Sequence, residues 1–119
     1  KYFKAKNVHY RPWGKYVNLF VGKGFLVKEL YVKAKGVLSL QKHYHRAEHW
    51  MVTQGVPKIT LNKKSFFKNP NETIYIPQGA IHRIQNIYKK PVKIIEVQVG
   101  SILKETDIVR YEDVYGRVK

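Results

Sequence analysis

Short runs of alternating apolar and polar residues recur from residue 16 to residue 99, and this pattern constrains the fold more than any other feature. Successive side chains of a β-strand point to opposite faces, so such alternation indicates strands with one buried face. The runs are rich in Val, Ile, Tyr and Phe, and the turn-forming residues Gly, Pro and Asn separate them. The predicted strands cover residues 16–21, 25–34, 37–45, 49–53, 57–61, 63–67, 73–76, 82–86 and 92–99.

Strands of this number and spacing predict an all-β fold, either a sandwich or a jelly-roll barrel, and we favour the barrel. The alternation stops in residues 103–118, where Thr106 or Asp107 could begin a short C-terminal helical segment toward Tyr111. The 119 residues fit a single domain, residues 1–119, with one core. Because the sequence begins at Lys1 rather than at a methionine, we also consider that it is a fragment of a longer polypeptide.

The composition narrows the chemistry that the chain can support. Without cysteine, any metal must be held by nitrogen and oxygen ligands. We expect a cytoplasmic protein with no membrane partner, because no apolar run approaches the ~20 residues that span a bilayer and no signal peptide precedes the first strand. The net charge of +15 attracts anions, but most of the lysines, Lys28 among them, are scattered, so we interpret them as solvated surface. No basic run is interleaved with aromatic residues, so we expect no nucleic acid partner.

Two short motifs contain most of the histidines. In an extended strand Gln41, His43 and His45 project to one side, and Glu48 follows closely enough for a bulge or turn to bring its carboxylate back. The second motif is Pro77-x-Gly79-x-x-His82, in which the turn directs the next strand and His82 opens it. Imidazole, carboxylate and amide groups together suit a divalent ion such as Zn, Co or Mn. An isolated histidine would more simply be a core residue, but the clustering favours a metal site.

The paired motifs resemble the signature of the cupin superfamily, a double-stranded β-helix that holds one metal ion. In that signature the carboxylate follows the second ligand of the first motif by three or four residues. The spacing in this chain therefore favours Gln41, His43, Glu48 and His82 as ligands, with His45 as a fifth candidate or as a supporting partner. Two roles remain open here, because Gln41 could instead satisfy the backbone and His45 strains the spacing.

Further matches run through the chain in a fixed order. They are Arg11-Pro12-Trp13-Gly14, Leu38-Ser39-Leu40-Gln41, His45-Arg46-Ala47-Glu48-His49-Trp50, Tyr75-Ile76-Pro77, His82-Arg83, Asp107-Ile108-Val109-Arg110 and Tyr115-Gly116-Arg117. Together they resemble the type II phosphomannose isomerase domain, which commonly follows a mannose-1-phosphate guanylyltransferase domain in a bifunctional protein. The resemblance implies interconversion of mannose 6-phosphate and fructose 6-phosphate through an enediol. Tyr44 replaces a histidine that is common in relatives, and alternation predicts that it points away from the metal.

Isomerisation requires an electrophile on the sugar oxygens, which a metal supplies, and a base that is active near neutral pH. Candidate bases are His49, His45 and Glu96, of which we favour His49. Because a guanidinium binds phosphate in a bidentate manner, we propose Arg46 and Arg110 as phosphate ligands and Arg83 as a further cation of the active site. Arg46 beside Glu48 could instead form a surface ion pair of little energetic value.

A broader alternative concerns the role of the domain. It could be a non-catalytic, sugar-phosphate-binding or regulatory domain of a nucleotidyltransferase. By analogy with cupins we also expect a homodimer, in which the N-terminal segment through Phe20 is a candidate for exchange between the subunits.

Overall fold

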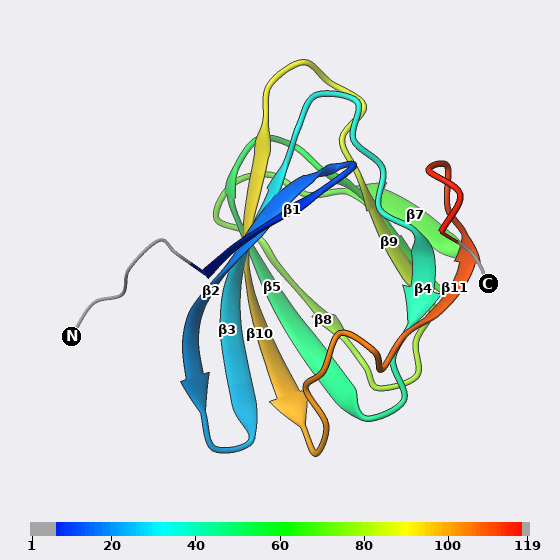
Figure 1. Ribbon diagram of the computed structural model, residues 1–119. Helices are drawn as coiled ribbons and strands as arrows, with labels where there is room; N and C mark the ends of the chain where they lie inside the picture. Colours follow the sequence, from blue (N-terminus) through cyan, green and yellow to red (C-terminus); the bar gives the residue numbers. More distant parts are fainter. Residues whose placement is uncertain (1–6, 118–119) are drawn as a thin grey trace.

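The computed structural model describes residues 7–117, which form two antiparallel β-sheets that face each other (Figure 1). The six-stranded sheet contains, in spatial order, β1 (Val8–Arg11), β2 (Gly14–Gly22), β3 (Phe25–Val32), β10 (Val92–Gly100), β5 (Arg46–Gln54) and β8 (Thr73–Ile76). The five-stranded sheet contains β11 (Val109–Glu112), β4 (Leu40–Lys42), β9 (His82–Gln85), β6 (Lys58–Leu61) and β7 (Lys64–Phe67). The prediction of an all-β jelly-roll barrel is therefore confirmed.

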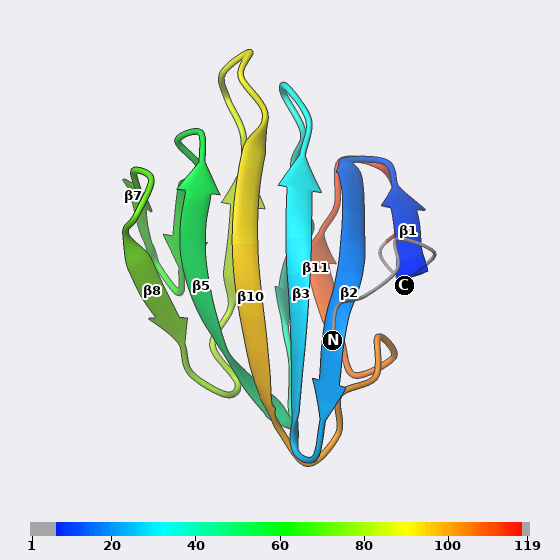
Figure 2. The same cartoon turned by 90° about the vertical axis from the view of Figure 1, so that its left-hand side faces the viewer.

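Strands β3, β10 and β5 lie side by side at the centre of the larger sheet and form one wall of the barrel (Figure 2). Their register aligns the inward-facing residues in rows across the sheet. Ile94 of β10 is opposite Leu30 on one side and Val52 on the other, and all three are buried. Further along, the inward positions become polar, because Glu96 is opposite Lys28 and Gln98 is opposite Glu48. The barrel interior therefore has an apolar half and a polar half.

The apolar half contains the hydrophobic core. Alternation along each strand sends every second side chain into it, and burying these side chains stabilises the fold by roughly 25 cal/mol per Å² of apolar surface. Its largest fully buried members come from both sheets and include Trp50, Ile59, Ile76, Ile84 and Ile94. The core thus fixes the two sheets against each other and leaves the polar half as a supported cavity.

The expectation of a C-terminal helix was wrong. The stretch from Thr106 to Tyr111 forms a turn and then strand β11, which pairs with β4. Asp107 does not cap a helix, because its carboxylate accepts hydrogen bonds from the backbone N–H groups of Tyr44 and His45, at 3.0 and 2.9 Å. The same bonds end β4 early, so the predicted strand 37–45 is reduced to Leu40–Lys42 and an isolated bridge at Val37.

Two further boundaries differ from the sequence prediction. β1 was not predicted, and it pairs with β2 at the edge of the larger sheet. β5 begins at Arg46 rather than at residue 49, so that Arg46 and Glu48 both stand on a regular strand and point inward.

Within the part of the chain that the structure describes, no helix has the length and apolar character needed to cross a bilayer.

Candidate metal centre and cavity

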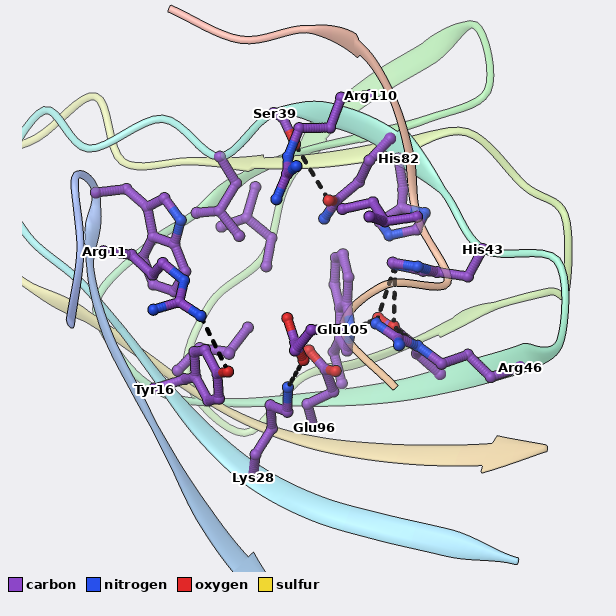
Figure 3. A pocket seen from close by; sticks show the side chains of 18 of the residues that line it. Arg11, Tyr16, Lys28, Ser39, His43, Arg46, His82, Glu96, Glu105 and Arg110 are labelled. Atoms are coloured by element: carbon purple, nitrogen blue, oxygen red, sulfur yellow. Dashed lines mark hydrogen bonds and ion pairs between the residues drawn. The ribbon is translucent and has the colours of Figure 1, made fainter. Parts of the chain in front are cut away.

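Three buried side chains from three different elements meet in the polar half of the barrel (Figure 3). His43 follows β4, Glu48 lies on β5 and His82 opens β9. One nitrogen or oxygen atom from each lies within 4.8 Å of the others, and His43 Nε2 is 3.4 Å from Glu48 Oε2. The two sequence motifs, nearly forty residues apart in the chain, are therefore joined in one cluster.

Backbone carbonyl groups determine which nitrogen of each histidine is free. His43 Nδ1 lies 2.6 Å from the carbonyl oxygen of Asp107, and His82 Nδ1 lies 2.9 Å from that of Ala80. A carbonyl oxygen only accepts hydrogen bonds, so both Nδ1 atoms carry the proton and both Nε2 atoms have a lone pair. Metal-binding histidines commonly donate their second nitrogen to a carbonyl in this way.

Glu48 is held in place by donors on both of its oxygens. Trp50 Nε1 donates to Oε1 at 2.9 Å, and Arg46 Nε donates to Oε2 at 2.8 Å. A second nitrogen of Arg46, Nη2, lies 3.1 Å from His43 Nε2. The Arg46 side chain is only 5% exposed, so the interpretation of Arg46 and Glu48 as a surface ion pair is wrong.

Burial favours the neutral form of both histidines. Burial is the largest cause of the lowered pKa of His43, about 4, and the nearby Arg46 acts in the same direction. The pKa of His82 is lowered mainly by burial as well. For Glu48, burial disfavours the charged form, but His82 and Arg46 outweigh it and lower its pKa to about 2. Two neutral imidazoles and one carboxylate at neutral pH are a suitable donor set for a divalent ion.

Gln41 and His45, the two ligand candidates left open by spacing, lie in different environments. Gln41 is opposite His82 in the β4–β9 pairing and lines the cavity, where its Oε1 accepts a hydrogen bond from Ser39 Oγ at 3.1 Å. The His45 side chain is 47% exposed, and its Nδ1 lies 3.2 Å from Asp107 Oδ1. Because β4 ends at Lys42, the strand alternation that would have placed His45 beside His43 does not continue. Tyr44 is exposed, as alternation predicted.

The cluster passes a test of fit for a metal ion that does not depend on sequence. His82 Nε2 is buried, has a lone pair, and has no hydrogen-bond partner among the described residues. A buried polar atom without a partner costs free energy, and a cation at this position would satisfy it. The nitrogen and oxygen donors suit Zn, Co or Mn. His43, Glu48 and His82 are the residues that could hold such an ion, and Gln41 lines the same cavity.

A cavity extends from this cluster and is lined by charged and apolar side chains together (Figure 3). Glu96 lies in it and is 4% exposed, and it accepts a hydrogen bond from Gln98 Nε2. Burial, with Glu48 as a second cause, raises the pKa of Glu96 to about 7. Of the three candidate bases predicted from sequence, Glu96 is the one that the structure places inside the barrel.

Lys28 is a cavity residue that sequence reasoning missed. We expected a solvated lysine, but Lys28 is 3% exposed, and its Nζ lies 2.7 Å from Glu105 Oε2 and 4.0 Å from the centre of the Tyr16 ring. The signal was available, because Lys28 alternates in phase with Leu26 and Leu30 and so shares their inward face.

Three further arginines line the cavity, Arg11 from β1 of the larger sheet and Arg110 and Arg117 from the C-terminal segment. Arg110 on β11 was predicted, whereas Arg11 and Arg117 were not assigned a role. Burial and the neighbouring Arg117 lower the pKa of Arg110, and its Nε is buried without a partner in the described residues. A buried guanidinium nitrogen without an acceptor, close to other cations, forms a suitable environment for an anion.

Two predicted active-site residues lie outside the cavity. His49 is exposed on the outer face of β5, where its ring centre lies 4.7 Å from that of Tyr75, with the two ring planes tilted by 40°. Arg83 points away from the interior, with Nε donating to the Leu38 carbonyl at 3.0 Å and Nη1 3.3 Å from Glu112 Oε1. The cause is the same for both, because each directly follows an inward-facing residue on a strand and alternation turns it outward.

The chain has the cupin fold. Solved structures agree on the fold. The chain is similar to the cupin domain of Cnp3 from Schizosaccharomyces pombe, with a TM-score of 0.70 and 20% identity over 73% of this chain and 64% of that one. It is also similar to the formate complex of oxalate decarboxylase from Lactobacillus farciminis, with a TM-score of 0.75 and 21% identity over 87% of this chain and 32% of that one.

Sequence comparison identifies the family. Residues 1–113 match the family described as mannose-6-phosphate isomerase C-terminal, and the chain belongs to this family. Curated relatives include the alginate biosynthesis protein AlgA of Pseudomonas aeruginosa, 51% identical over 91% of this chain. The mannose-1-phosphate guanylyltransferase ManC of Salmonella typhimurium is 50% identical over 92%, and the xanthan biosynthesis protein XanB of Xanthomonas campestris is 49% identical over 91%. The matched region is only 22–23% of each relative's length.

Proposed function

We propose that this domain is a metal-dependent mannose-6-phosphate isomerase, which interconverts mannose 6-phosphate and fructose 6-phosphate. The observation that carries the proposal is Glu96, a buried carboxylate with a pKa of about 7 in the same cavity as the cluster of His43, Glu48 and His82. A base with such a pKa is half-ionised at neutral pH and is suited to both accepting and returning a proton. Membership of the isomerase family supports the same conclusion.

In this mechanism Glu96 moves one proton between two neighbouring carbons. Its carboxylate accepts the proton from C2 of the open-chain aldose, the electron pair of the C2–H bond forms the C1–C2 double bond, and the electrons of the C1 carbonyl move to O1. A proton passes from O2 to O1, the O2 electrons form the C2 carbonyl, and the carboxylic acid of Glu96 returns its proton to C1. A divalent ion held by Gln41, His43, Glu48 and His82 would supply the electrophile that polarises the sugar oxygens. The Gln98 amide, which donates to Glu96, holds the carboxylate inside the cavity.

We further propose that Arg110 binds the substrate phosphate, with Arg11 as a second cation of the same cavity. Arg117 also lines the cavity, but its guanidinium is bonded to Asp113. The Nε of Arg110, which is buried without a partner among the described residues, and the cationic neighbours of Arg110 support its role. Arg46 was also a candidate, but its guanidinium is occupied by Glu48 and His43. Arg83 lies on the other side of its strand and is withdrawn from the proposal.

The test is the conversion of mannose 6-phosphate to fructose 6-phosphate by metal-stripped protein, with and without Zn, Co or Mn. We expect turnover only with added metal and none in a His43→Ala, His82→Ala double variant. His45→Ala is the matched control and retains activity, because His45 is outside the cluster. A folded wild-type protein that turns over with none of the three metals would contradict the proposal.

A second candidate function follows from the relatives, some of which are described as mannose-1-phosphate guanylyltransferases and are several times longer than this chain. The domain would then be a non-catalytic, sugar-phosphate-binding or regulatory part of such a protein. It would be stabilised by mannose 6-phosphate without forming product. Thermal denaturation with ligand, in parallel with the turnover assay, distinguishes the two functions.

We also propose a homodimer, and a cytoplasmic location remains a prediction. In the structure β1 and β2, which contain most of the N-terminal segment considered for exchange, pair within the chain's own sheet. Uncharged side chains are exposed along the larger sheet, among them Phe20, Tyr75 and Val99. With a net charge of +15, two copies repel least at an uncharged surface. Light scattering on wild-type protein and on Val99→Asp tests this, and a wild-type monomer would contradict it.

A further inference from the structure

Arg46 uses the same atoms that a metal ion would bind. Its Nη2 lies 3.1 Å from His43 Nε2, and its Nε lies 2.8 Å from Glu48 Oε2. Both acceptors belong to the cluster of candidate metal ligands. The guanidinium is buried and fixed from the other side by a bond from Nη1 to the Lys104 carbonyl at 3.3 Å. A cation of the protein itself is therefore present at the edge of the metal centre (Figure 3).

The two contacts of Arg46 differ in whether they can persist when a metal binds. His43 Nε2 has one lone pair, because Nδ1 carries the proton that is donated to Asp107. That lone pair accepts either an Arg46 N–H or a metal ion, but not both. Glu48 Oε2 has two lone pairs, so it can bind a metal and still accept from Arg46 Nε. Metal entry therefore breaks the contact to His43 and leaves the contact to Glu48.

We propose that Arg46 is a built-in competitor of the metal ion, which occupies the His43 lone pair in metal-free protein and lowers the affinity of the site for metal. This inference rests on the proposed metal centre. In the absence of metal, Arg46 compensates the buried charge of Glu48, which would otherwise be strongly destabilising. The site thus remains assembled without metal, at the expense of affinity.

Displacement has a consequence for the cavity. Once Nη2 leaves His43, it is a buried donor without an acceptor in a cavity that Arg46 already lines. An oxygen of a bound sugar or of another oxyanion can accept its hydrogen bond. Arg46 therefore becomes available to a ligand only after metal has bound, which couples ligand binding to the presence of metal.

The test measures Zn²⁺ and Co²⁺ affinity by competition with a chelator, in wild-type protein and in Arg46→Gln. The variant removes a competing donor and a positive charge beside the ion, so we expect its metal affinity to rise at least about tenfold. The d–d absorption of bound Co²⁺ reports the ligand environment independently of activity. The control is Trp50→Phe, which removes the other donor to Glu48 but keeps Arg46. We expect its affinity to be unchanged or lower, because orienting partners support metal binding.

An Arg46→Gln affinity equal to or lower than that of wild type would overturn the inference, since Arg46 would then orient Glu48 rather than compete. Arg46→Lys provides a second variant in case the first does not fold. It keeps the charge, but an ammonium lacks the fork that reaches His43 and Glu48 together, so we expect an intermediate affinity. Binding by wild type without a gain in either variant rejects the competition alone. No binding by any folded variant rejects the metal centre as well.

Discussion

The identity of each metal ligand is a question at the scale of single residues. His43 and His82 are committed to their tautomers by backbone carbonyl groups, whereas the fourth position is contested between Gln41 and His45. Gln41 is opposite His82 on the neighbouring strand, and His45 is bound to Asp107 outside the cluster. Position in space therefore favours Gln41, which sequence spacing alone left open.

Replacing these two residues separately distinguishes them. We expect Gln41→Ala to weaken Zn²⁺ binding by roughly tenfold or more, because one oxygen donor is lost from the set. His45→Ala should leave the affinity unchanged. Isothermal titration of both variants with Zn²⁺ checks this, and a loss confined to His45→Ala would assign the fourth ligand to His45.

Two arginines that appear equivalent in sequence also differ in their position relative to the cavity. Arg110 lines the cavity, whereas Arg83 pairs with Glu112 on the outer side of its sheet. We expect Arg110→Met to raise the KM for mannose 6-phosphate roughly tenfold to a hundredfold, since a charge-assisted hydrogen bond to phosphate is lost. Arg83→Met should not change KM. Steady-state kinetics of the two variants tests the assignment, and equal effects would contradict it.

The sequence could predict which side chains meet inside the barrel where a motif fixed their surroundings, as for His43, Glu48 and His82. It could not favour Glu96 over His49 as the candidate base, because residue type alone gives a histidine the better pKa near neutrality. Burial reverses this, since it raises the pKa of Glu96 to about 7 while His49 is exposed to solvent. Lys28 was predicted to be solvated on the basis of composition. The alternation of its neighbours Leu26 and Leu30 would have predicted that it is buried.

At the scale of elements, the place where β10 meets the start of β5 positions the charged part of the site. Gly100 is opposite Arg46 in the register, and a Cβ atom at Gly100 would meet the His45 carbonyl oxygen and the Arg46 backbone. The absence of a side chain at residue 100 therefore lets β5 begin close enough to β10 for Arg46 and Glu48 to face the cavity.

Gly100→Ala should consequently be destabilising by about 2–4 kcal/mol, because backbone atoms must separate to admit the methyl group. Gly24→Ala is the control. Its Cβ would meet nothing within 4 Å, so only its positive φ is penalised, by about 1–2 kcal/mol. Urea unfolding compares the two. Losses of equal size would show that the contact with β5 is not the cause.

The turn after β11 is stabilised by a single carboxylate. Asp113 accepts hydrogen bonds from the backbone N–H groups of Tyr115 and Arg117, and it forms an ion pair with Arg117 at 2.6 Å. Burial opposes its ionisation, but the hydrogen bonds from Arg117 outweigh it and lower the pKa of Asp113. A carboxyl group whose pKa is lower in the folded state stabilises the protein above its ordinary pKa and ceases to do so as pH falls through the folded value.

We therefore expect Asp113→Asn to reduce the free energy of unfolding by about 1–2 kcal/mol at pH 7. The difference from wild type should shrink as pH falls below the ordinary aspartate value of 3.8. Urea titrations at a series of pH values measure it. A difference that is independent of pH would assign the effect to turn geometry rather than to charge.

Prediction from sequence failed for elements whose structure depends on contacts between residues far apart in the chain. The alternating strands of the core were identifiable because each buries one face. β11 was not, because its turn depends on Asp107 bonding to the β4–β5 loop more than sixty residues away. Asp107 is a residue type that often caps a helix, but its hydrogen bonds to the β4–β5 loop determine the structure here. The neighbouring sequence does not reveal those bonds.

At the scale of the whole molecule, the barrel separates stability from chemistry. The apolar half holds the two sheets together, and the polar half carries buried charges such as Glu48, Glu96 and Lys28 that a small core would not otherwise tolerate. The account therefore requires that reaction occurs inside the barrel. Residues on the outer face, although adjacent to the ligands in sequence, should be dispensable for it.

The measurement that tests this most directly is the exchange of the substrate's transferred proton with solvent, followed by NMR in D₂O with metal-loaded protein and mannose 6-phosphate. Wild type should form fructose 6-phosphate with deuterium at C1. We predict that Glu96→Gln abolishes both product and label, while His49→Gln, on the outer face of the same sheet, retains both. Loss of label in His49→Gln with retention in Glu96→Gln would contradict the account.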